Sequence, residues 1–221
     1  MPQFHLRRLG HAVALALGIL AAGSGAASAA EGRMSEETFS IGGQPRRAVI
    51  HDYSSGKATA PVVILLHGGG GNPENAITMT RFDALAAREG LIAVYPGGTG
   101  AMAGGRILTW NAGHCCAFAM RNRSDDVGFI SALIDRLVAS GRADPGRIYV
   151  TGMSNGGMMS HRLAREMSGR IAAIAPVVGA VFGDEPPPAG PVPAFIIVGA
   201  VDRTVPGAGG PLGLRDDVLQ G

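Results

Sequence analysis

The stretch Val150-Thr151-Gly152-Met153-Ser154-Asn155-Gly156-Gly157 decides the fold. It follows a short apolar run and precedes a helix-forming segment, so it has both the Gly-x-Ser-x-Gly pattern and the strand–turn–helix setting of a nucleophile elbow. Small residues two positions before and after the serine let the strand and helix backbones approach closely, while the turn lifts the hydroxyl clear of the sheet. Ser154 is therefore the candidate nucleophile, and Asn155 opens the helix with its backbone N–H free.

A second glycine-rich stretch, residues 67–71 (His-Gly-Gly-Gly-Gly), directly follows the continuous apolar run at 61–66. Glycines at this place let the backbone pass close to a ligand and present N–H groups to a developing negative charge. We therefore expect an oxyanion hole made by the backbone N–H groups of Asn155 and of Gly69 or a neighbouring glycine. A phosphate-binding loop fits poorly, because the Gly-Lys-Ser/Thr ending is missing.

The rest of the chain reads as strands alternating with helices, which predicts a mostly parallel α/β sheet flanked by helices. Residues 97–124, rich in glycine and carrying the lone Trp110, read as a long functional loop. The predicted elements are a hairpin around Gly42-Gly43, strands at 61–66, 91–95, 147–150, 171–178 and 194–198, and helices at 76–89, from Asp125-Asp126 to Gly141, and at 157–167.

The N-terminal residues have the three-part pattern of a secretory signal peptide, with Arg7-Arg8, an apolar run at 12–22 and small residues up to Ala29. The apolar run is about half of the ~20 residues that a membrane span requires. We predict a leader at 1–29, one domain at 30–221, and a secreted protein without a stable membrane anchor. Removing the leader takes away two arginines and no acidic residue, so the formal net charge falls from +2 to zero. A nucleic-acid partner therefore has no electrostatic support.

Cys115 and Cys116 are the only cysteines in the chain. Three alternatives stay open for them: a strained bond between the two neighbours, one or both thiols free and buried, or a bond from one of them to a cysteine that this chain does not contain. A metal site is not predicted, because the ligand spacings that zinc sites use are missing.

Asp202 is the candidate acid of the site, because it follows the last predicted strand at the carboxyl edge of the sheet. A turn-forming aspartate is the alternative, with Asp184 as the fallback acid. The base must lie within hydrogen-bond reach of the serine. His161 is excluded, because seven residues along a helix place it about 10 Å down the axis. His67 and His114 stay open as the base, although His67 is expected mainly to shape the glycine loop.

Together these stretches resemble the secreted esterases grouped as polyhydroxybutyrate depolymerases, which include feruloyl and acetyl-xylan esterases. The resemblance implies an α/β-hydrolase fold, hydrolysis of carboxylic esters through an acyl-enzyme at Ser154, a Ser-Asp-His triad that includes Asp202, and no metal or organic cofactor. The implied substrate is a polyester, a feruloylated polysaccharide or a small acyl ester. The matching stretches lie between Pro61 and Pro206 and are residues 67–72, 95–97, 109–111 with the two cysteines, 125–129 and 152–158.

The sequence departs from this family at two places. Val198-Gly199-Ala200-Val201 stands before Asp202 where the family usually has His-Gly-Thr, and no histidine follows Asp202. The resemblance places the family's catalytic histidine and a partner cysteine beyond Gly221, so we expect a C-terminally incomplete esterase that lacks the last strand and helix. Such a sheet would expose its final strand as an edge that favours self-association.

A second hypothesis is an inactive homologue that keeps only a carbohydrate- or polymer-binding surface made by the glycine loop and the Trp110 loop. An exposed tryptophan would suit stacking on a sugar ring, whereas a buried one would not.

Overall fold

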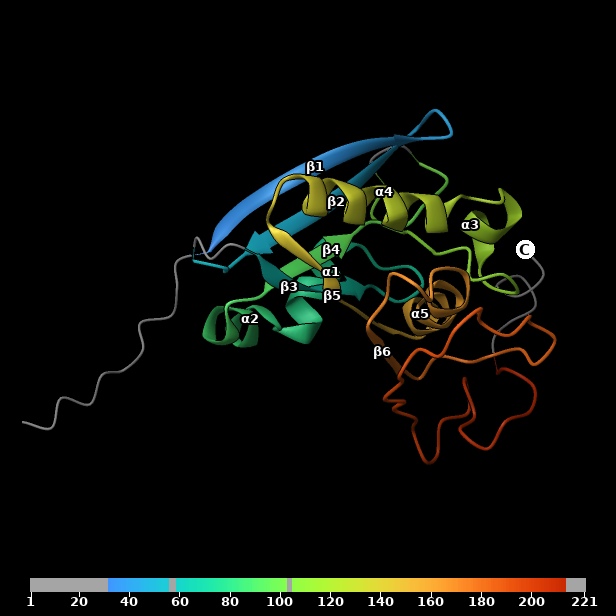
Figure 1. Ribbon diagram of the computed structural model, residues 1–221. Helices are drawn as coiled ribbons and strands as arrows, with labels where there is room; N and C mark the ends of the chain where they lie inside the picture. Colours follow the sequence, from blue (N-terminus) through green and yellow to red (C-terminus); the bar gives the residue numbers. More distant parts are fainter. Residues whose placement is uncertain (1–31, 56–58, 103–104, 214–221) are drawn as a thin grey trace, which may run out of the picture.

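The structure is a computed structural model that describes residues 32–55, 59–102 and 105–213, so the predicted leader lies outside the described residues. Six strands form one sheet in the order β1-β2-β4-β3-β5-β6 (Figure 1). The strands are β1 (Arg33–Ile41), β2 (Gln44–Asp52), β3 (Ala60–Leu66), β4 (Ile92–Pro96), β5 (Ala143–Met153) and β6 (Ala173–Val177), and the helices are α1 (Pro73–Thr80), α2 (Asp83–Glu89), α3 (Ala117–Arg121), α4 (Asp126–Ala139) and α5 (Asn155–Glu166).

The sheet is parallel among β4, β3, β5 and β6 and antiparallel where β2 pairs. β4, β3, β5 and β6 run in the same direction, while β2 pairs antiparallel with both β1 and β4. Parallel strands whose two faces are covered by helices are the arrangement that the alternating pattern predicts. The mostly parallel α/β fold is therefore confirmed, as are the predicted hairpin and the parallel strands at 61–66, 91–95 and 171–178.

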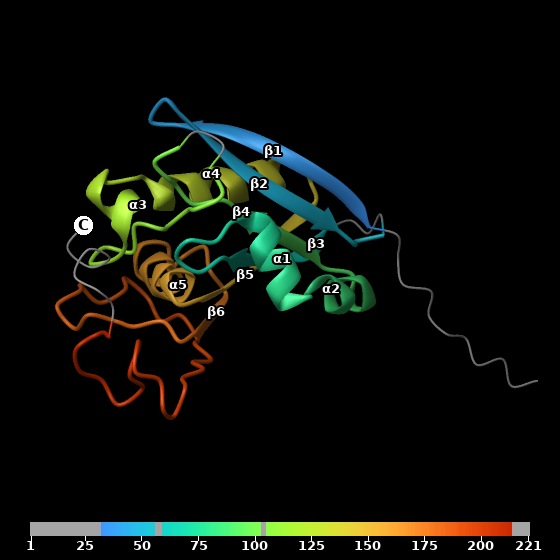
Figure 2. The same ribbon diagram turned by 180° about the vertical axis from the view of Figure 1, so that it is seen from behind.

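Two apolar clusters fill the two faces of the sheet. α4 and α5 pack on one face, where the helical stripe of Phe129, Ile130, Leu133, Ile134 and Leu137 is fully buried as its spacing predicts. α1 and α2 cover the other face, which Figure 2 shows from behind, over a smaller cluster that includes Leu65 and Tyr95. The carboxyl ends of β3, β4 and β5 meet at the edge where the glycine-rich turns begin.

Three predicted elements differ from the structure. The helix predicted at 76–89 is two helices, because Arg81 adopts a left-handed conformation (φ 48°) and its N–H closes α1 on the Ile77 carbonyl. The loop predicted at 97–124 contains α3. The strand predicted at 194–198 runs parallel to β6 but meets it only at isolated bridges, such as Val177–Ile197.

No helix in the described ranges combines the length and the apolar character that a membrane span requires.

Candidate active site

Ser154 sits in a strained turn between β5 and α5. Its backbone lies at φ 54° and ψ −120°, a region that residues other than glycine avoid, and its N–H donates to the Val177 carbonyl at 2.9 Å. The flanking glycines are required by close packing: a Cβ on Gly152 would lie 2.5 Å from the backbone of Gly156, and a Cβ on Gly156 would lie 2.5 Å from two carbonyls at the end of β3. The sequence pattern therefore forms a true strand–turn–helix elbow.

The glycine loop packs directly against this elbow. A Cβ placed on Gly68 would lie 3.9 Å from the Ser154 Cβ, and one on Gly69 would lie 3.6 Å from the Asn155 Cβ. Gly70 and Gly71 donate their N–H groups to backbone carbonyls, whereas within the described residues the N–H groups of Gly69 and Asn155 have no protein acceptor. Two unpaired N–H groups beside a serine hydroxyl are what an oxyanion hole needs.

The Asn155 side chain clamps the backbone of Trp110. Its Oδ1 accepts the Trp110 N–H at 2.7 Å, and its Nδ2 donates to the Trp110 carbonyl at 3.0 Å. The indole N–H of Trp110 in turn donates to the His67 carbonyl at 3.0 Å. Trp110 is 0% exposed, so the idea that its ring forms a sugar-stacking surface is wrong. Its role is to join the glycine loop to the elbow.

His67 is held as a neutral ring with both nitrogens occupied. Nδ1 lies 2.8 Å from the Gly68 carbonyl and must donate, while Nε2 accepts the Gly98 N–H at 3.0 Å. Burial lowers the pKa of His67 to about 4, because the charged form would lose its hydration. No ring nitrogen is left for Ser154, so His67 shapes the glycine loop and does not serve as the base in this arrangement.

The other histidines of the described ranges also lie away from Ser154: His51 of β2, for example, has its Nδ1 at 2.9 Å from Asp83 Oδ1 of α2. His114 pairs with Asp184 at 3.1 Å, beside a cavity lined by Arg162 and Arg165. Arg162 lies eight residues after Ser154, so this cavity flanks α5 about 12 Å down the helix axis. His161 is on α5 itself, and burial lowers its pKa.

Asp202 lies in a short turn after the segment that runs beside β6. Its Oδ1 accepts the backbone N–H groups of Thr204 at 2.8 Å and Val205 at 3.0 Å. The geometry matches the turn-forming alternative, and it also fixes the carboxylate at the carboxyl edge of the sheet, on the side of β6 away from β5.

Cys115 and Cys116 are bonded to each other, which is the first of the three alternatives that their adjacency left open. Both are buried between α3 and the Trp110 segment. In the described part of the chain, no group of three or more His, Cys, Asp or Glu side chains is placed to hold a metal ion.

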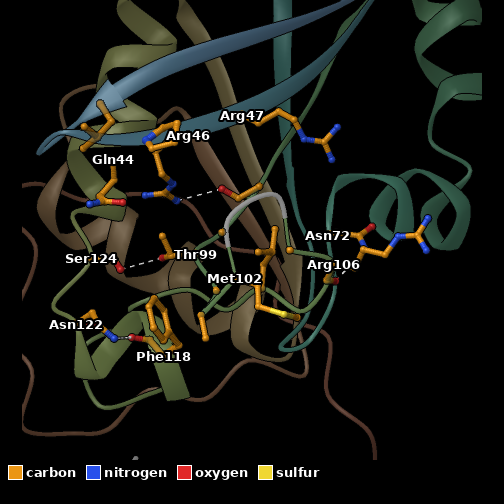
Figure 3. A pocket seen from close by; sticks show the side chains of 18 of the residues that line it. Gln44, Arg46, Arg47, Asn72, Thr99, Met102, Arg106, Phe118, Asn122 and Ser124 are labelled. Atoms are coloured by element: carbon orange, nitrogen blue, oxygen red, sulfur yellow. Dashed lines mark hydrogen bonds between the residues drawn. The ribbon is translucent and has the colours of Figure 1, made fainter.

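A groove of about 1490 Å³ opens at the carboxyl end of β4, between the tip of the β1–β2 hairpin, α1 and α3 (Figure 3). Gln44 and Arg46 line it from the hairpin, Phe118 from α3, and Asn122 from just after α3. Gly98, which also lines it, donates to His67, so the groove begins next to the glycine loop.

Sequence analysis missed one buried ion pair near this groove. Arg46 of β2 binds Asp126 at the start of α4, and both side chains are almost fully buried. The only local sign was a pair of aspartates at the start of α4, of which Asp125 alone caps the helix by accepting the Gly128 N–H.

Comparisons with known proteins show the family of this chain. Residues 51–207 match the family described as esterase PHB depolymerase. The chain belongs to this family. Among curated relatives, it is 31% identical over 157 residues to the bifunctional acetylxylan esterase/xylanase XynS20E of Neocallimastix patriciarum, covering 69% of this chain and 21% of that protein. It is also 31% identical over 172 residues to feruloyl esterase B of Piromyces equi, covering 74% of this chain and 31% of that protein.

The fold of this esterase family member is also that of known esterases. A solved acetyl xylan esterase from Aspergillus awamori has a TM-score of 0.51 and 19% sequence identity, covering 65% of this chain and 52% of that chain. The α/β-hydrolase fold is therefore confirmed. The chain spans less than a third of the length of the two curated relatives named above, so their whole activities are not carried over to it.

Proposed function

We propose that this chain is a serine esterase that hydrolyses carboxylic esters through an acyl-enzyme at Ser154. The observation that carries the proposal is the strained elbow at Ser154 with the unpaired N–H groups of Gly69 and Asn155 beside it. In this mechanism the Ser154 oxygen bonds to the ester carbonyl carbon and its proton passes to solvent water, while the two N–H groups stabilise the oxyanion. The C–O bond to the alcohol then breaks, the alcohol leaves with a proton from water, and a second water hydrolyses the acyl-enzyme to the acid and free Ser154. The family membership supports ester hydrolysis as the reaction class.

We assign the acid role to Asp202. The segment before Asp202 bridges to β6, and β6 pairs with β5, so two strand spacings of about 4.8 Å each separate that segment from β5, which ends just before Ser154. A histidine between the two would complete the triad. Because the described histidines are held elsewhere, we expect slow turnover that rests on the oxyanion hole and on substrate binding.

Ser154, Asn155 and Gly69 do not line the groove at the end of β4, so the groove would hold a part of an extended substrate away from the scissile ester. The volume of the groove exceeds that of a pocket for a small ligand. Much of its charge is internally balanced, since Arg47 pairs with Glu36 and Glu74. The lining mixes apolar side chains such as Leu108 and Phe118 with polar ones and with Arg106 and Arg123, so it offers contacts to a polyester chain or to a hydroxyl-rich polymer alike.

Hydrolysis of p-nitrophenyl acetate by the full chain, with Ser154→Ala alongside, tests the proposal. Turnover that is lost in the variant, together with a mass increase of one acetyl group on the Ser154 peptide in the parent, is the expected result. Equal rates for parent and variant would refute the acyl-enzyme.

A non-catalytic polymer-binding protein is the second candidate, and the groove together with the engaged histidines favours it. Binding of xylo-oligosaccharides by the Ser154→Ala variant, with no turnover in the parent, would select this alternative.

We also propose that residues 1–29 direct secretion. An N-terminus at Ala30 or Glu31 in protein recovered outside the cytoplasm is expected, and an intact Met1 on exported protein would overturn the assignment.

A further inference from the structure

The buried ion pair between Arg46 and Asp126 is connected to both sides of the candidate oxyanion hole. We call these sides the Asn155 wall, which is the start of α5, and the His67 wall, which is the glycine loop at 67–71. Arg46 is 3% exposed and Asp126 is 0% exposed. A fully desolvated ion pair is costly to form, although breaking it is strongly destabilising. Net stabilisation of the fold therefore does not explain why this ion pair is present. Its connections to the site suggest a role in positioning.

One connection runs through the peptide group between Trp110 and Asn111. The N–H of this peptide, on Asn111, donates to Asp126 Oδ2 at 2.7 Å. The carbonyl of the same peptide, on Trp110, accepts from Asn155 Nδ2 at 3.0 Å. Asp126 therefore fixes the peptide on which the Asn155 side chain rests, and the backbone N–H of Asn155 is one of the two proposed oxyanion donors.

The second connection runs through the peptide group between Gly97 and Gly98. Its carbonyl accepts from Arg46 at 3.1 Å, as the dashed line in Figure 3 shows, and its N–H donates to His67 Nε2 at 3.0 Å. His67 in turn holds the carbonyl of Gly68, next to the other proposed donor at Gly69.

The two connections close into a ring, because the Trp110 indole donates to the His67 carbonyl. Peptide groups that are hydrogen-bonded at both ends transmit position well, since each bond polarises and aligns the next. The guanidinium also lies 4.3 Å from the ring centroid of Phe129, which fixes its plane.

We infer that Arg46 and Asp126 are a positioning pair for the oxyanion hole, holding the Asn155 wall through the Trp110–Asn111 peptide and the His67 wall through the Gly97–Gly98 peptide. Neither residue touches the reacting atoms. The catalytic part of this inference rests on the proposed esterase function, whereas the structural part can be measured without turnover.

The test is the substitution Asp126→Asn, with Asp125→Asn as the matched control. Both changes remove one negative charge at the start of α4, but Asp125 only caps the helix, and asparagine is as good a cap. The amide at 126 must turn its NH₂ toward either Arg46 or the Asn111 N–H, so one connection is broken.

Two measurements on Trp110, its backbone amide exchange and its fluorescence, report on the Asn155 wall, because Trp110 is hydrogen-bonded to the Asn155 side chain. The backbone N–H of Trp110, which donates to Asn155 Oδ1, is expected to exchange with solvent at least about 10-fold faster in Asp126→Asn. The emission of Trp110, the only tryptophan, is expected to shift to the red. In ester hydrolysis, kcat is expected to fall about 10-fold or more with KM within about twofold, because loss of an oxyanion donor costs 10²–10³ in kcat.

Arg46→Lys separates the two connections. A lysine keeps the charge opposite Asp126 but lacks the fork that also reaches the Gly97 carbonyl. It is expected to keep the parent's Trp110 exchange and emission while the Gly98 N–H exchanges faster with solvent. If Asp126→Asn does not fold, this variant still tests the positioning role of the ion pair.

Parent-like Trp110 exchange, emission and kcat in folded Asp126→Asn would overturn the inference, as would parent-like Gly98 exchange in Arg46→Lys. A parent chain without Ser154-dependent turnover would count against the proposed function alone, because the exchange and emission measurements still decide the positioning role.

Discussion

Replacing His67 with glutamine is expected to remove a large part of the acid sensitivity of this fold. The imidazole is buried and neutral in the folded chain, with a pKa lowered from 6.5 to about 4 by burial. Between these values the unfolded chain binds a proton that the folded chain does not, so the folded state loses stability as the pH falls.

The size of the effect follows from this difference. A shift of roughly 2.5 pKa units at 1.36 kcal/mol per unit corresponds to about 3 kcal/mol of unfolding free energy. This contribution is fully present above pH 6.5 and is lost as the pH falls to about 4. Asp52 and Glu74, whose pKa values are lowered by hydrogen bonds and nearby arginines, add acid sensitivity of the same sign, but they add it equally to parent and variant.

Urea unfolding at pH 7, 6, 5 and 4 measures this contribution. His67→Gln keeps a side-chain oxygen that can accept the Gly98 N–H. Between pH 7 and pH 4, the free energy of unfolding of this variant is expected to fall by about 3 kcal/mol less than that of the parent. Trp110→Phe is the control: it breaks the bond to the His67 carbonyl and leaves a cavity but keeps the imidazole, so its loss of unfolding free energy is expected to be the same at every pH. If His67→Gln and the parent lose equal stability over this range, the ring is not held neutral and the reasoning is wrong.

Three further predictions concern the elbow and the sheet edge. Gly156→Ala is expected to cost about 1–3 kcal/mol in thermal unfolding, since its Cβ would meet carbonyls at 2.5 Å, while Gly169→Ala, whose Cβ meets nothing within 4 Å, is expected to be close to neutral. Ser154→Gly is expected to abolish turnover and to raise the unfolding free energy by roughly 1 kcal/mol, because glycine relieves the strain at φ 54°; a destabilised variant would contradict the strain. Phe195→Lys is expected to reduce self-association in light scattering, since this 70% exposed ring lies on the segment beside β6, at the outer edge of the described residues; unchanged scattering would show that this edge does not drive association.

The fold could be predicted where the pattern is local and strong. The stripe on α4 and the apolar runs of β3 and β4 are buried as their spacing indicates. The break between α1 and α2 could not be predicted, because the left-handed stop falls on Arg81 with no glycine or proline to mark it. The segment at 194–198 has the apolar run of a strand, but periodicity does not reveal how fully a run will pair.

The candidate site also has one part that local sequence predicts and another that depends on long-range contacts. The elbow and the glycine loop are coded by contiguous residues, because strand, turn and helix follow one another along the chain. The clamp on Trp110 joins residues 45 positions apart, and the ion pair of Arg46 with Asp126 joins residues 80 positions apart. A single sequence gives no register for such contacts, so Asp126 reads as a second helix-capping residue and Trp110 reads as a loop residue.

The long-range contacts also explain why the residue after the serine is asparagine. The elbow pattern places no demand on that position, since only its backbone N–H faces the oxyanion. In this fold the Asn155 side chain is buried and offers one acceptor and one donor to the two backbone groups of a single residue, Trp110. A leucine would leave both groups of Trp110 unpaired, and an aspartate would offer no donor to the Trp110 carbonyl. The amide therefore makes the N–H at position 155 part of a rigid frame, so the orientation of that proposed oxyanion donor is set by the Trp110 loop as well as by the elbow.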